Sequence, residues 1–374
     1  MRYIEHLRLT DFRSYDQLDL SLSGAPVVLF GANGAGKTNL LEAVSFLSPG
    51  RGIRRAKVED IARRTNGDIC PAWGITANLG GLDLPMKLAV GQVPEYPKRR
   101  TVRIDDKSAT GATLAGHMTM MWLTPAQDRL FVGPSSDRRK FLDRFTLAHT
   151  PTHGFTSLRY EKLRTERNRL LSDGIDDRGW YDAIETDMAD HGAKIARARA
   201  ETVNTLIAEL TDQPDSAFPQ ASLLLDGEAE QHAQNGWGVD EISEFIRREL
   251  ADNRTQDMRA GRTLMGIHKT EFKVTHLEKN MPAADCSTGE QKALLISLVL
   301  AHARAQIART PILLLDEVAA HLDVHRRAAL SEHLIALGTQ VFMTGTDQSL
   351  FEAFGDRADK YEVTESRLKP ISRL

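Results

Sequence analysis

The sequence is poor in cysteine, with only Cys70 and Cys286 among 374 residues. Two cysteines cannot build a disulfide framework, and such low usage is typical of a reducing cytosol. Positive charge is not in excess either, because 48 lysines and arginines face 51 acidic residues and the net charge is −3. Any binding of nucleic acid must therefore come from local basic patches. The sequence also lacks internal repeats and long heptad runs, which excludes a repeat protein and a protein with a long coiled-coil arm.

Long hydrophobic runs are missing as well. The most apolar stretch, residues 293–307, is interrupted by His302, Arg304 and Gln306, and it falls short of the ~18 apolar residues of a membrane span. The chain starts with MRYIEH, which lacks the apolar region of a signal peptide. We therefore expect a cytoplasmic protein without a membrane anchor.

Short apolar or alternating runs predict strands in the first third of the chain and again near its end. These runs are residues 3–9, 17–22, 26–30, 72–77, 84–90, 100–104, 312–315, 340–344 and 360–364. Residues 125–262 show helical periodicity instead, with a predicted loop at 213–238 and Asp240 as the expected N-cap of the following helix. This order predicts a mixed sheet with flanking helices and an inserted helical lobe. The expected boundaries are 1–118 and 265–374 for the α/β ATPase lobe and 119–264 for the helical lobe.

Residues 31–38 read GANGAGKT and match the phosphate-binding pattern G-x-x-x-x-G-K-[ST] in full. An apolar strand precedes the motif and an amphipathic helix follows it, as a phosphate-binding loop requires. Its glycines let backbone N–H groups curl around phosphate oxygens, and the helix N-terminus adds a positive dipole end. Lys37 is expected to pair with the β- and γ-phosphates and Thr38 to bind Mg²⁺. The candidate ATP-binding residues are Gly31, Ala32, Asn33, Gly34, Ala35, Gly36, Lys37, Thr38 and Asn39.

An apolar run at 312–315 ends in two carboxylates, Asp316 and Glu317. A buried strand here would present Asp316 beside the phosphate loop, where it can hold Mg²⁺. Glu317 would orient the attacking water, which makes it a candidate catalytic residue together with Lys37. The alternative is a plain strand followed by a helix N-cap. The complete phosphate loop upstream favours the functional interpretation.

Residues 286–292, CSTGEQK, open a strongly apolar helix. Thr288 and Gln291 have the spacing of a capping box, so one interpretation is a well-capped core helix. The pattern Ser-x-Gly-x-Gln some two dozen residues before the acidic pair is also similar to the signature loop of ABC-type ATPases. That resemblance implies that Ser287, Thr288, Gly289 and Gln291 contact ATP held by a second subunit.

Further segments resemble the RecF family and related SMC-type heads. They are residues 9–15 (LTDFRSY), 48–54 (SPGRGIR), 124–128 (TPAQD), 138–143 (RRKFLD), 261–268 (GRTLMGIH) and the D-loop-like 319–323 (AAHLD). The resemblance implies that Arg13 reaches the nucleotide phosphates and that Asp323 acts in the D-loop. It also implies that Gln127 links Mg²⁺ to the helical lobe, although an exposed loop glutamine is an equally good interpretation. Two departures are Asp11 in place of the usual asparagine and the absence of a switch histidine at residues 344–347.

Local basic clusters indicate DNA binding through the phosphate backbone, with affinity that falls as salt rises. The candidate DNA contacts are Arg51, Arg54, Arg55, Lys57, Arg138 and Arg139. The alternative is a set of solvated helix faces. The sequence contains no zinc-finger pattern that would read bases, so binding is expected to follow backbone or junction shape.

The resemblance implies an ATP-gated homodimer with ATP and Mg²⁺ as cofactors and weak, DNA-stimulated hydrolysis. It further implies binding of double-stranded DNA near single-strand gaps, and work with RecR and RecO to load RecA in repair, replication restart and SOS induction. Two alternatives stay open: the nucleotide-binding subunit of a membrane transporter, and a structural clamp that binds ATP without hydrolysis. About 250 residues separate the phosphate loop from the signature segment, which is long for a transporter subunit.

Overall fold

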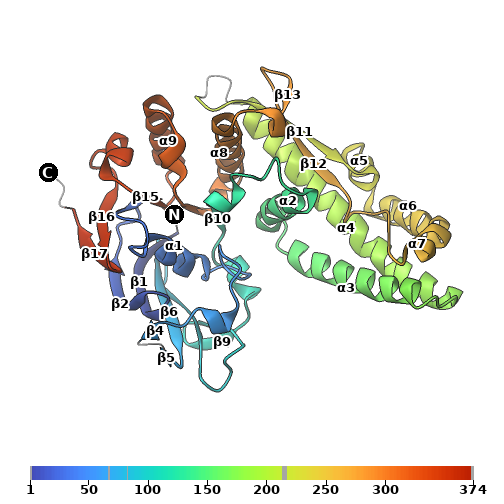
Figure 1. Cartoon of the computed structure of the whole chain (residues 1–374), viewed down its shortest axis with the longest axis horizontal. Helices are drawn as coiled ribbons and strands as arrows, with labels where there is room; N and C mark the ends of the chain where they lie inside the picture. Colours follow the sequence, from blue (N-terminus) through green and yellow to red (C-terminus); the bar gives the residue numbers. More distant parts are fainter. Residues whose placement is uncertain (1, 66–67, 82, 213–216, 372–374) are drawn as a thin grey trace. The chain divides into compact units, whose positions relative to one another are not determined.

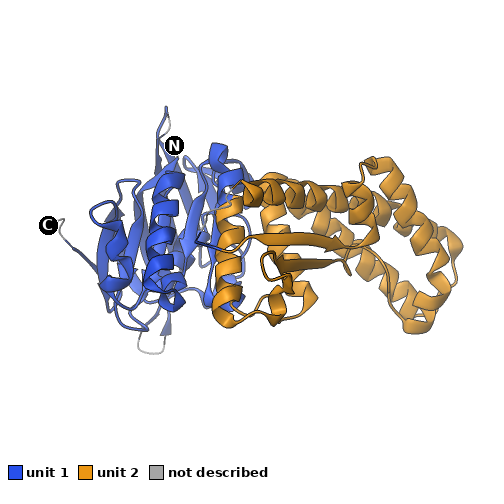
Figure 2. Ribbon diagram, turned by 90° about the horizontal axis from the view of Figure 1, so that it is seen from above, with its two compact units in different colours: residues 1–127, 216–218, 303–374 blue, residues 128–215, 219–302 orange. Residues whose placement is uncertain are grey.

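The computed structural model describes residues 2–65, 68–81, 83–212 and 217–371. The chain forms two compact units (Figure 2), of which the first comprises residues 1–127, 216–218 and 303–374 and the second 128–215 and 219–302. The predicted plan, an α/β core whose two sequence halves flank a helical insertion, is confirmed. The two units are bounded differently from the expected lobes, with residues 119–127 in the first unit and residues 265–302 in the second.

The first unit contains an antiparallel sheet of six strands in the order β2-β1-β6-β7-β8-β9. Its strands are β1 (Tyr3–Phe12), β2 (Tyr15–Ser21), β6 (Trp73–Gly80), β7 (Met86–Gln92), β8 (Thr101–Ile104) and β9 (Lys107–Ala109) (Figure 1). Ile4, Leu7 and Leu9 of β1 are fully buried between more exposed polar residues, with a register shift between Ile4 and His6. One face of the sheet is therefore apolar and requires a partner layer. A separate two-stranded ribbon joins β4 (Arg64–Thr65) and β5 (Asp68–Ile69).

The second sheet of this unit also has six strands, in the order β10-β14-β15-β3-β16-β17. Its strands are β3 (Val27–Phe30), β10 (Met120–Leu123), β14 (Ile312–Leu315), β15 (Val341–Gly345), β16 (Asp359–Thr364) and β17 (Arg367–Pro370). All neighbouring pairs are parallel except β16–β17. The central strands β3, β14 and β15 are buried along their whole length, as expected for a parallel sheet covered on both faces.

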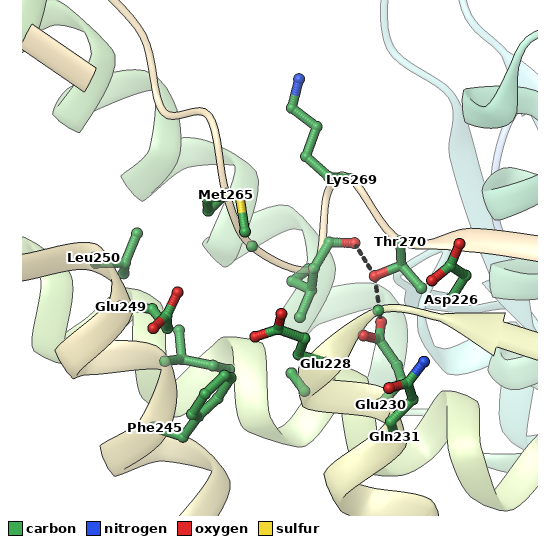
Figure 3. A pocket seen from close by; sticks show the side chains of 15 residues that line it. Asp226, Glu228, Glu230, Gln231, Phe245, Glu249, Leu250, Met265, Lys269 and Thr270 are labelled. Atoms are coloured by element: carbon green, nitrogen blue, oxygen red, sulfur yellow. Dashed lines mark hydrogen bonds between the residues drawn. The ribbon is translucent and has the colours of Figure 1, made fainter. Parts of the chain in front are cut away.

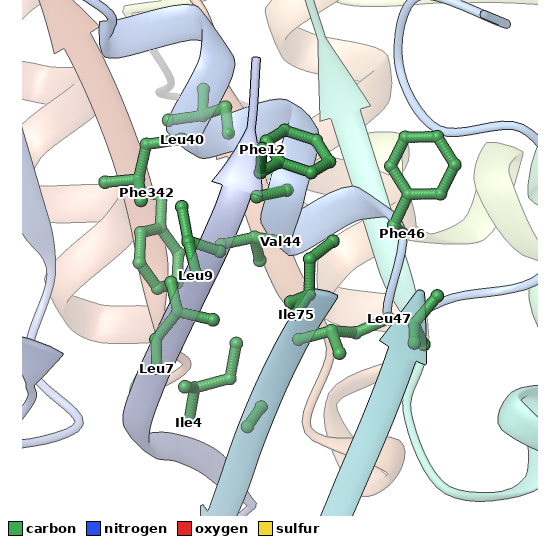
Figure 4. Packing of buried hydrophobic residues seen from close by; sticks show 14 of the residues in the cluster. Ile4, Leu7, Leu9, Phe12, Leu40, Val44, Phe46, Leu47, Ile75 and Phe342 are labelled. Carbon is green, nitrogen blue, oxygen red and sulfur yellow. The ribbon is translucent and has the colours of Figure 1, made fainter. Parts of the chain in front are cut away.

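Helix α1 (Lys37–Ser45) packs into the core that joins the two sheets (Figure 4). Its Leu40 and Val44 belong to the same buried cluster as Leu9 of the first sheet and Phe342 of the second. Burial of each such side chain contributes roughly 1.5–3 kcal/mol relative to exposure. The packing fixes α1 and therefore the loop that precedes it. Helix α9 (Val324–Leu337) follows β14.

The second unit is mainly helical, with a three-stranded antiparallel sheet in the order β11-β12-β13. Its helices are α2 (Ser135–His149), α3 (His153–Ser172), α4 (Arg178–Thr211), α5 (Glu228–Gln234), α6 (Val239–Asp252), α7 (Arg254–Ala260) and most of α8 (Thr288–Ala305). Its strands are β11 (Ala221–Asp226), β12 (Glu271–His276) and β13 (Met281–Pro282).

Two local predictions for the second unit are wrong. The described part of the predicted loop 213–238 contains β11 and α5, while residues 213–216 lie outside the described residues. Helix α6 begins at Val239 with Gly238 as N-cap, whose N–H donates to the Glu241 carboxylate at 2.7 Å, so Asp240 is not the cap. The acid three residues after the cap thus supplies the half of a capping box that accepts from the N-cap N–H.

Two buried arginines hold the helices of this unit together. Arg167 is 0% exposed and pairs with Glu185 at 3.0 Å and with Asp257 at 2.6 Å. Arg199 pairs with Asp143 at 2.8 Å and with Glu230 at 2.9 Å. These ions link α2, α3, α4, α5 and α7. Among the described residues, no helix combines the length and apolar character needed to cross a membrane.

Candidate nucleotide-binding site

The parallel strands of the first unit bring the predicted nucleotide residues to one edge of the sheet. Phe30, the last residue of β3, is in register with Gly345 of β15, and Leu315 of β14 is in register with Met343 of the same strand. The phosphate loop, the acidic pair and the residues around Thr344 therefore leave neighbouring carboxyl ends. This is the edge at which open parallel sheets bind ligands.

Glycine is required at both ends of the phosphate loop. Gly31 has φ 143°, and a Cβ there would lie 2.3 Å from the Val363 carbonyl oxygen. Gly36 has φ 111° and would place a Cβ 2.8 Å from Ser366 Oγ. Gly34, at φ 81°, faces open space within 4 Å. The loop thus wraps an open cradle at the N-terminus of α1, which fits a phosphate group.

The Lys37 side chain lies inside this cradle and is 4% exposed. Its ammonium donates to the carbonyl oxygens of Gly31 at 2.6 Å and Ala32 at 2.8 Å. Burial lowers the pKa of Lys37, and the carboxylates of Glu317 and Asp316 oppose that effect. The cation is therefore held in the loop by backbone acceptors and lies within the field of the acidic pair.

A hydrogen-bonded chain joins the loop helix to the acidic pair. Thr38 Oγ1 donates to Asp316 Oδ1 at 3.0 Å, and Thr344 Oγ1 donates to the same oxygen at 2.7 Å. The Glu317 N–H donates to Thr344 Oγ1 at 2.9 Å, which holds Glu317 in a left-handed conformation with φ 53°. A hydroxyl and a carboxylate oxygen 3.0 Å apart form a donor set that suits Mg²⁺.

The substitution Thr344→Val tests the role of this threonine, which lies in the segment where the family resemblance implies a switch histidine. Without the hydroxyl, Asp316 loses a donor and the Glu317 N–H loses its acceptor. We expect the single-turnover rate of ATP hydrolysis to fall about tenfold, or ~1.4 kcal/mol of barrier, while ATP affinity changes less than threefold. Thr344→Ser keeps the hydroxyl and should retain most of the rate. An unchanged rate in the valine variant would remove Thr344 from the site.

In the structure, the Arg13 side chain forms an ion pair with Glu42 of α1. Its guanidinium binds both Glu42 oxygens, at 2.9 and 2.8 Å, and donates to the Asp60 carbonyl at 2.7 Å. Glu42 is fully buried on α1 and also pairs with Arg54 at 3.1 Å. Arg13 therefore anchors α1, and the phosphate contact implied by the resemblance would require this bidentate pair to break. Asn39 likewise donates to Ser14 Oγ at 2.7 Å.

Gln127 and Asp323 also have local partners. Gln127 lies just after β10, whose neighbour β14 leads into Asp316, but its Oε1 accepts from the backbone N–H and the hydroxyl of Thr124. Asp323 is the N-cap of α9 and accepts from the Arg326 N–H at 2.8 Å. That hydrogen bond lowers the pKa of Asp323. Their predicted roles with metal and with a second subunit stay predictions.

The signature segment lies in the second unit at the start of α8. Ser287 and Thr288 are exposed, and Gly289 is partly exposed with open space around its Cα. The capping pair is Ser287 with Glu290, at 2.9 Å, rather than Thr288 with Gln291 as predicted. Hydrogen bonds from Lys279 and Ser287 lower the pKa of Glu290 to about 2. Gln291 is buried and donates to the Cys286 carbonyl at 2.8 Å, so it supports the turn.

The candidate DNA contacts divide into two groups. Arg51, Arg54, Arg55 and Lys57 lie at the surface after α1, although Arg54 is tied to Glu42 and to Asn39. Arg138 is bound to the Glu271 carboxylate, at 2.6 and 2.9 Å, and to three carbonyl oxygens. Arg139 donates to the Thr270 carbonyl at 2.8 Å. We therefore leave Arg138 and Arg139 out of the proposed DNA surface.

A family model described as "RecF/RecN/SMC N terminal domain" matches residues 3–368. A relative from Caulobacter vibrioides is 46% identical over 376 residues, which cover 98% of this chain and 97% of the relative. A relative from Mesorhizobium japonicum is 48% identical over 374 residues and 98% of each chain. Both are named DNA replication and repair protein RecF. The chain belongs to the RecF family. Membership of this family argues against the alternative that the chain is the nucleotide-binding subunit of a membrane transporter.

Solved structures agree with the fold of this RecF-family chain. One, described as the recombination mediator protein RecF-ATPrS in the RecFOR pathway, has a TM-score of 0.86 at 20% identity and covers 99% of this chain and 98% of its own. An Smc head domain from Pyrococcus furiosus has a TM-score of 0.59 at 15% identity, with 99% and 96% covered. The predicted ABC-type head with an inserted helical lobe is thereby confirmed as the fold.

Proposed function

We propose that this chain is an ATP-dependent DNA-binding protein of recombinational repair and a weak, DNA-stimulated ATPase. The observation that carries the proposal is the convergence of Lys37, Thr38, Asp316 and Glu317 at one strand edge in a member of the RecF family. Relatives named DNA replication and repair protein RecF support the role in DNA repair. A similar structure named for its ATP complex supports the binding of ATP.

Each residue has a separate task in the proposed site. The loop 31–36 and the α1 N-terminus hold the phosphates, and Lys37 exchanges its loop carbonyls for phosphate oxygens. Thr38 and Asp316 would hold Mg²⁺, with Gln127 as a further candidate ligand, and the ion would supply positive charge next to the phosphates. Glu317 accepts a proton from, or orients, a water molecule. Thr344 positions Asp316 and Glu317 for these tasks.

The exposed signature residues suit contact with a second copy of the chain. In the proposed dimer, Ser287, Thr288 and Gly289 cap the partner's γ-phosphate, so ATP binds the closed dimer better than the open monomer. Hydrolysis removes that differential contact and reopens the dimer. Gln291 acts indirectly, because it holds the backbone of the signature turn.

The proposed substrate is double-stranded DNA beside a single-strand gap, bound in the cytoplasm through the basic segment that contains Arg51, Arg55 and Lys57. RecR and RecO are the proposed partners in loading RecA, in line with the RecFOR pathway named for the similar structure. Because the chain lacks the switch histidine, one alternative function stays open: a structural clamp that binds ATP without hydrolysing it. A single-turnover hydrolysis assay separates the two.

Lys37→Ala tests the proposal directly. The variant loses a charge-assisted contact worth about 1.5–3 kcal/mol, so ATP affinity is expected to fall roughly 10- to 150-fold. The measurement is sedimentation velocity with ATP and gapped DNA at about 1 µM chain, a concentration suited to a dimer of moderate affinity. The wild type should sediment as a dimer and the variant as a monomer.

The exposed Lys107→Ala, on β9, is the matched control and should behave as the wild type. A wild-type chain that stays monomeric with ATP and gapped DNA would refute ATP-gated dimerisation. Equal ATP affinity in Lys37→Ala would refute the nucleotide site itself.

A further inference from the structure

The second unit contains a pocket of about 350 Å³ that has no part in the proposed ATP site (Figure 3). Its walls are the end of β11, the first turn of α5, the last turns of α6 and the segment 265–270. The volume falls within the ~300–1,000 Å³ of pockets that hold small ligands or side chains of a partner.

Four carboxylates and one ammonium line this pocket. Asp226 is paired with Lys273, while Glu228 and Glu249 approach from two different helices. Lys269, the one lysine of the lining, extends away from these carboxylates in Figure 3. The pocket therefore carries a negative field that favours a cation and repels nucleic acid.

The fourth carboxylate, Glu230, is fully buried in the wall. Its Oε1 accepts from Arg199 at 2.9 Å and from Thr270 Oγ1 at 2.8 Å, whereas Oε2 has no hydrogen-bond partner among the described residues. Oε2 faces Gly227, also in the lining, where a Cβ would lie 2.7 Å from it. A buried carboxylate oxygen without a donor adds negative potential to the wall of the pocket.

Arg199 neutralises Glu230 only in part, because its guanidinium is shared between two carboxylates. It binds Asp143 through Nε and Nη2 as well as Glu230 through Nη1. Burial acts to lower the pKa of Arg199, but the carboxylates of Asp143 and Glu230 outweigh it and raise that pKa. Glu230 therefore shares its cation with Asp143, which also contacts His153 at 3.0 Å.

The remaining lining is apolar and partly aromatic. Phe245 packs edge-on against His232 with ring centroids 4.6 Å apart, and His232 stacks on Trp237 at 3.8 Å. These contacts fix the Phe245 ring as a wall against which a cation can lie. Met265 is 42% exposed, and its flexible thioether side chain adapts to different apolar shapes.

We propose that this pocket docks a basic side chain of a partner protein together with a neighbouring aliphatic residue. The ammonium or guanidinium lies between Glu228 and Glu249, its stem covers Phe245, and the aliphatic residue packs on Met265. A small polycation would satisfy the carboxylates but leave the apolar wall uncovered. A basic and apolar peptide segment matches both parts of the lining.

The test uses the full chain and a fluorescein-labelled peptide in which two arginines alternate with three leucines. Fluorescence anisotropy should show saturable binding with a dissociation constant below about 1 mM. The double variant Glu228→Gln with Glu249→Gln should weaken binding at least tenfold, and Met265→Ser about threefold. Circular dichroism verifies that each variant is folded.

Asp252→Asn is the matched control, because Asp252 is an exposed carboxylate on α6 outside the lining, and binding should change less than twofold. A peptide with glutamines in place of the arginines should bind at least tenfold more weakly. Equal binding of that peptide, or equal binding by the Glu228/Glu249 variant, would overturn the proposal. Spermine that binds as tightly and displaces the peptide would also overturn it in favour of a polyamine site.

Discussion

Glu317→Gln is expected to slow ATP hydrolysis by about 10²–10⁴-fold, the usual contribution of a general base, while ATP affinity changes less than threefold. The amide keeps the size of the side chain and the backbone hydrogen bond to Thr344, so the cradle and the metal ligands are retained. A dimer that closes on ATP and reopens only after hydrolysis should therefore accumulate on DNA. Single-turnover hydrolysis gives the rate, and light scattering with ATP and gapped DNA gives the dimer.

Glu352→Gln provides the comparison, since Glu352 is exposed in the segment after β15 and should leave both readouts unchanged. Two outcomes count against the proposal. A Glu317→Gln variant that hydrolyses ATP at the wild-type rate would remove Glu317 from catalysis. A variant that binds ATP but stays monomeric would show that the triphosphate does not gate dimerisation.

Arg167→Met is expected to lower the free energy of unfolding of the second unit by about 3–5 kcal/mol. The arginine is fully buried and is held by Glu185, Asp257, Thr263 and the Leu250 carbonyl. Methionine fills much of the volume but leaves the buried Asp257 without its cation, whereas Glu185 keeps its second partner, Arg254. Urea unfolding followed by circular dichroism should show a midpoint at least about 1 M lower.

Arg169→Met on the same helix is the matched control, because the Arg169 side chain is 83% exposed and pairs only loosely with Asp173 at 3.6 Å. Its midpoint should shift by less than about 0.3 M, as for most surface changes. Adding Asp257→Asn to Arg167→Met removes one buried charge and should recover part of the loss. A midpoint for Arg167→Met equal to the control would show that the ion cluster does not hold the unit together.

The first unit was predictable from sequence because its signals are local. The run 312–315 and the phosphate loop each carry their own periodicity or spacing, and the strands observed at Ile312–Leu315 and Val27–Phe30 agree closely with the predicted runs. The sheet β11-β12 was missed because its two strands pair across about 45 to 55 residues, from Asp226–Glu271 to Ala221–His276. Six residues of alternation were too short to outweigh the Pro- and Gly-rich surroundings.

In the site, sequence spacing gave the residue types but not their hydrogen-bond partners. Glu42 was not singled out, yet it is the buried acid that holds both Arg13 and Arg54. A lone acid within an apolar helix face was the available signal. The Ser287–Glu290 cap was also visible as Ser-x-x-Glu, one residue before the pair that we predicted. The link from Thr344 to Asp316 depends on strand register, which the sequence does not reveal.

The two carbonyl oxygens that hold the Lys37 ammonium have a thermodynamic consequence. In the proposed site, the phosphates of a nucleotide would replace the acceptors that the loop already supplies to the Lys37 ammonium. For the proposed site, we expect the heat released on nucleotide titration to be a difference between similar hydrogen bonds, and therefore small. Lys37 thus has hydrogen-bond acceptors both before a nucleotide binds and after it leaves.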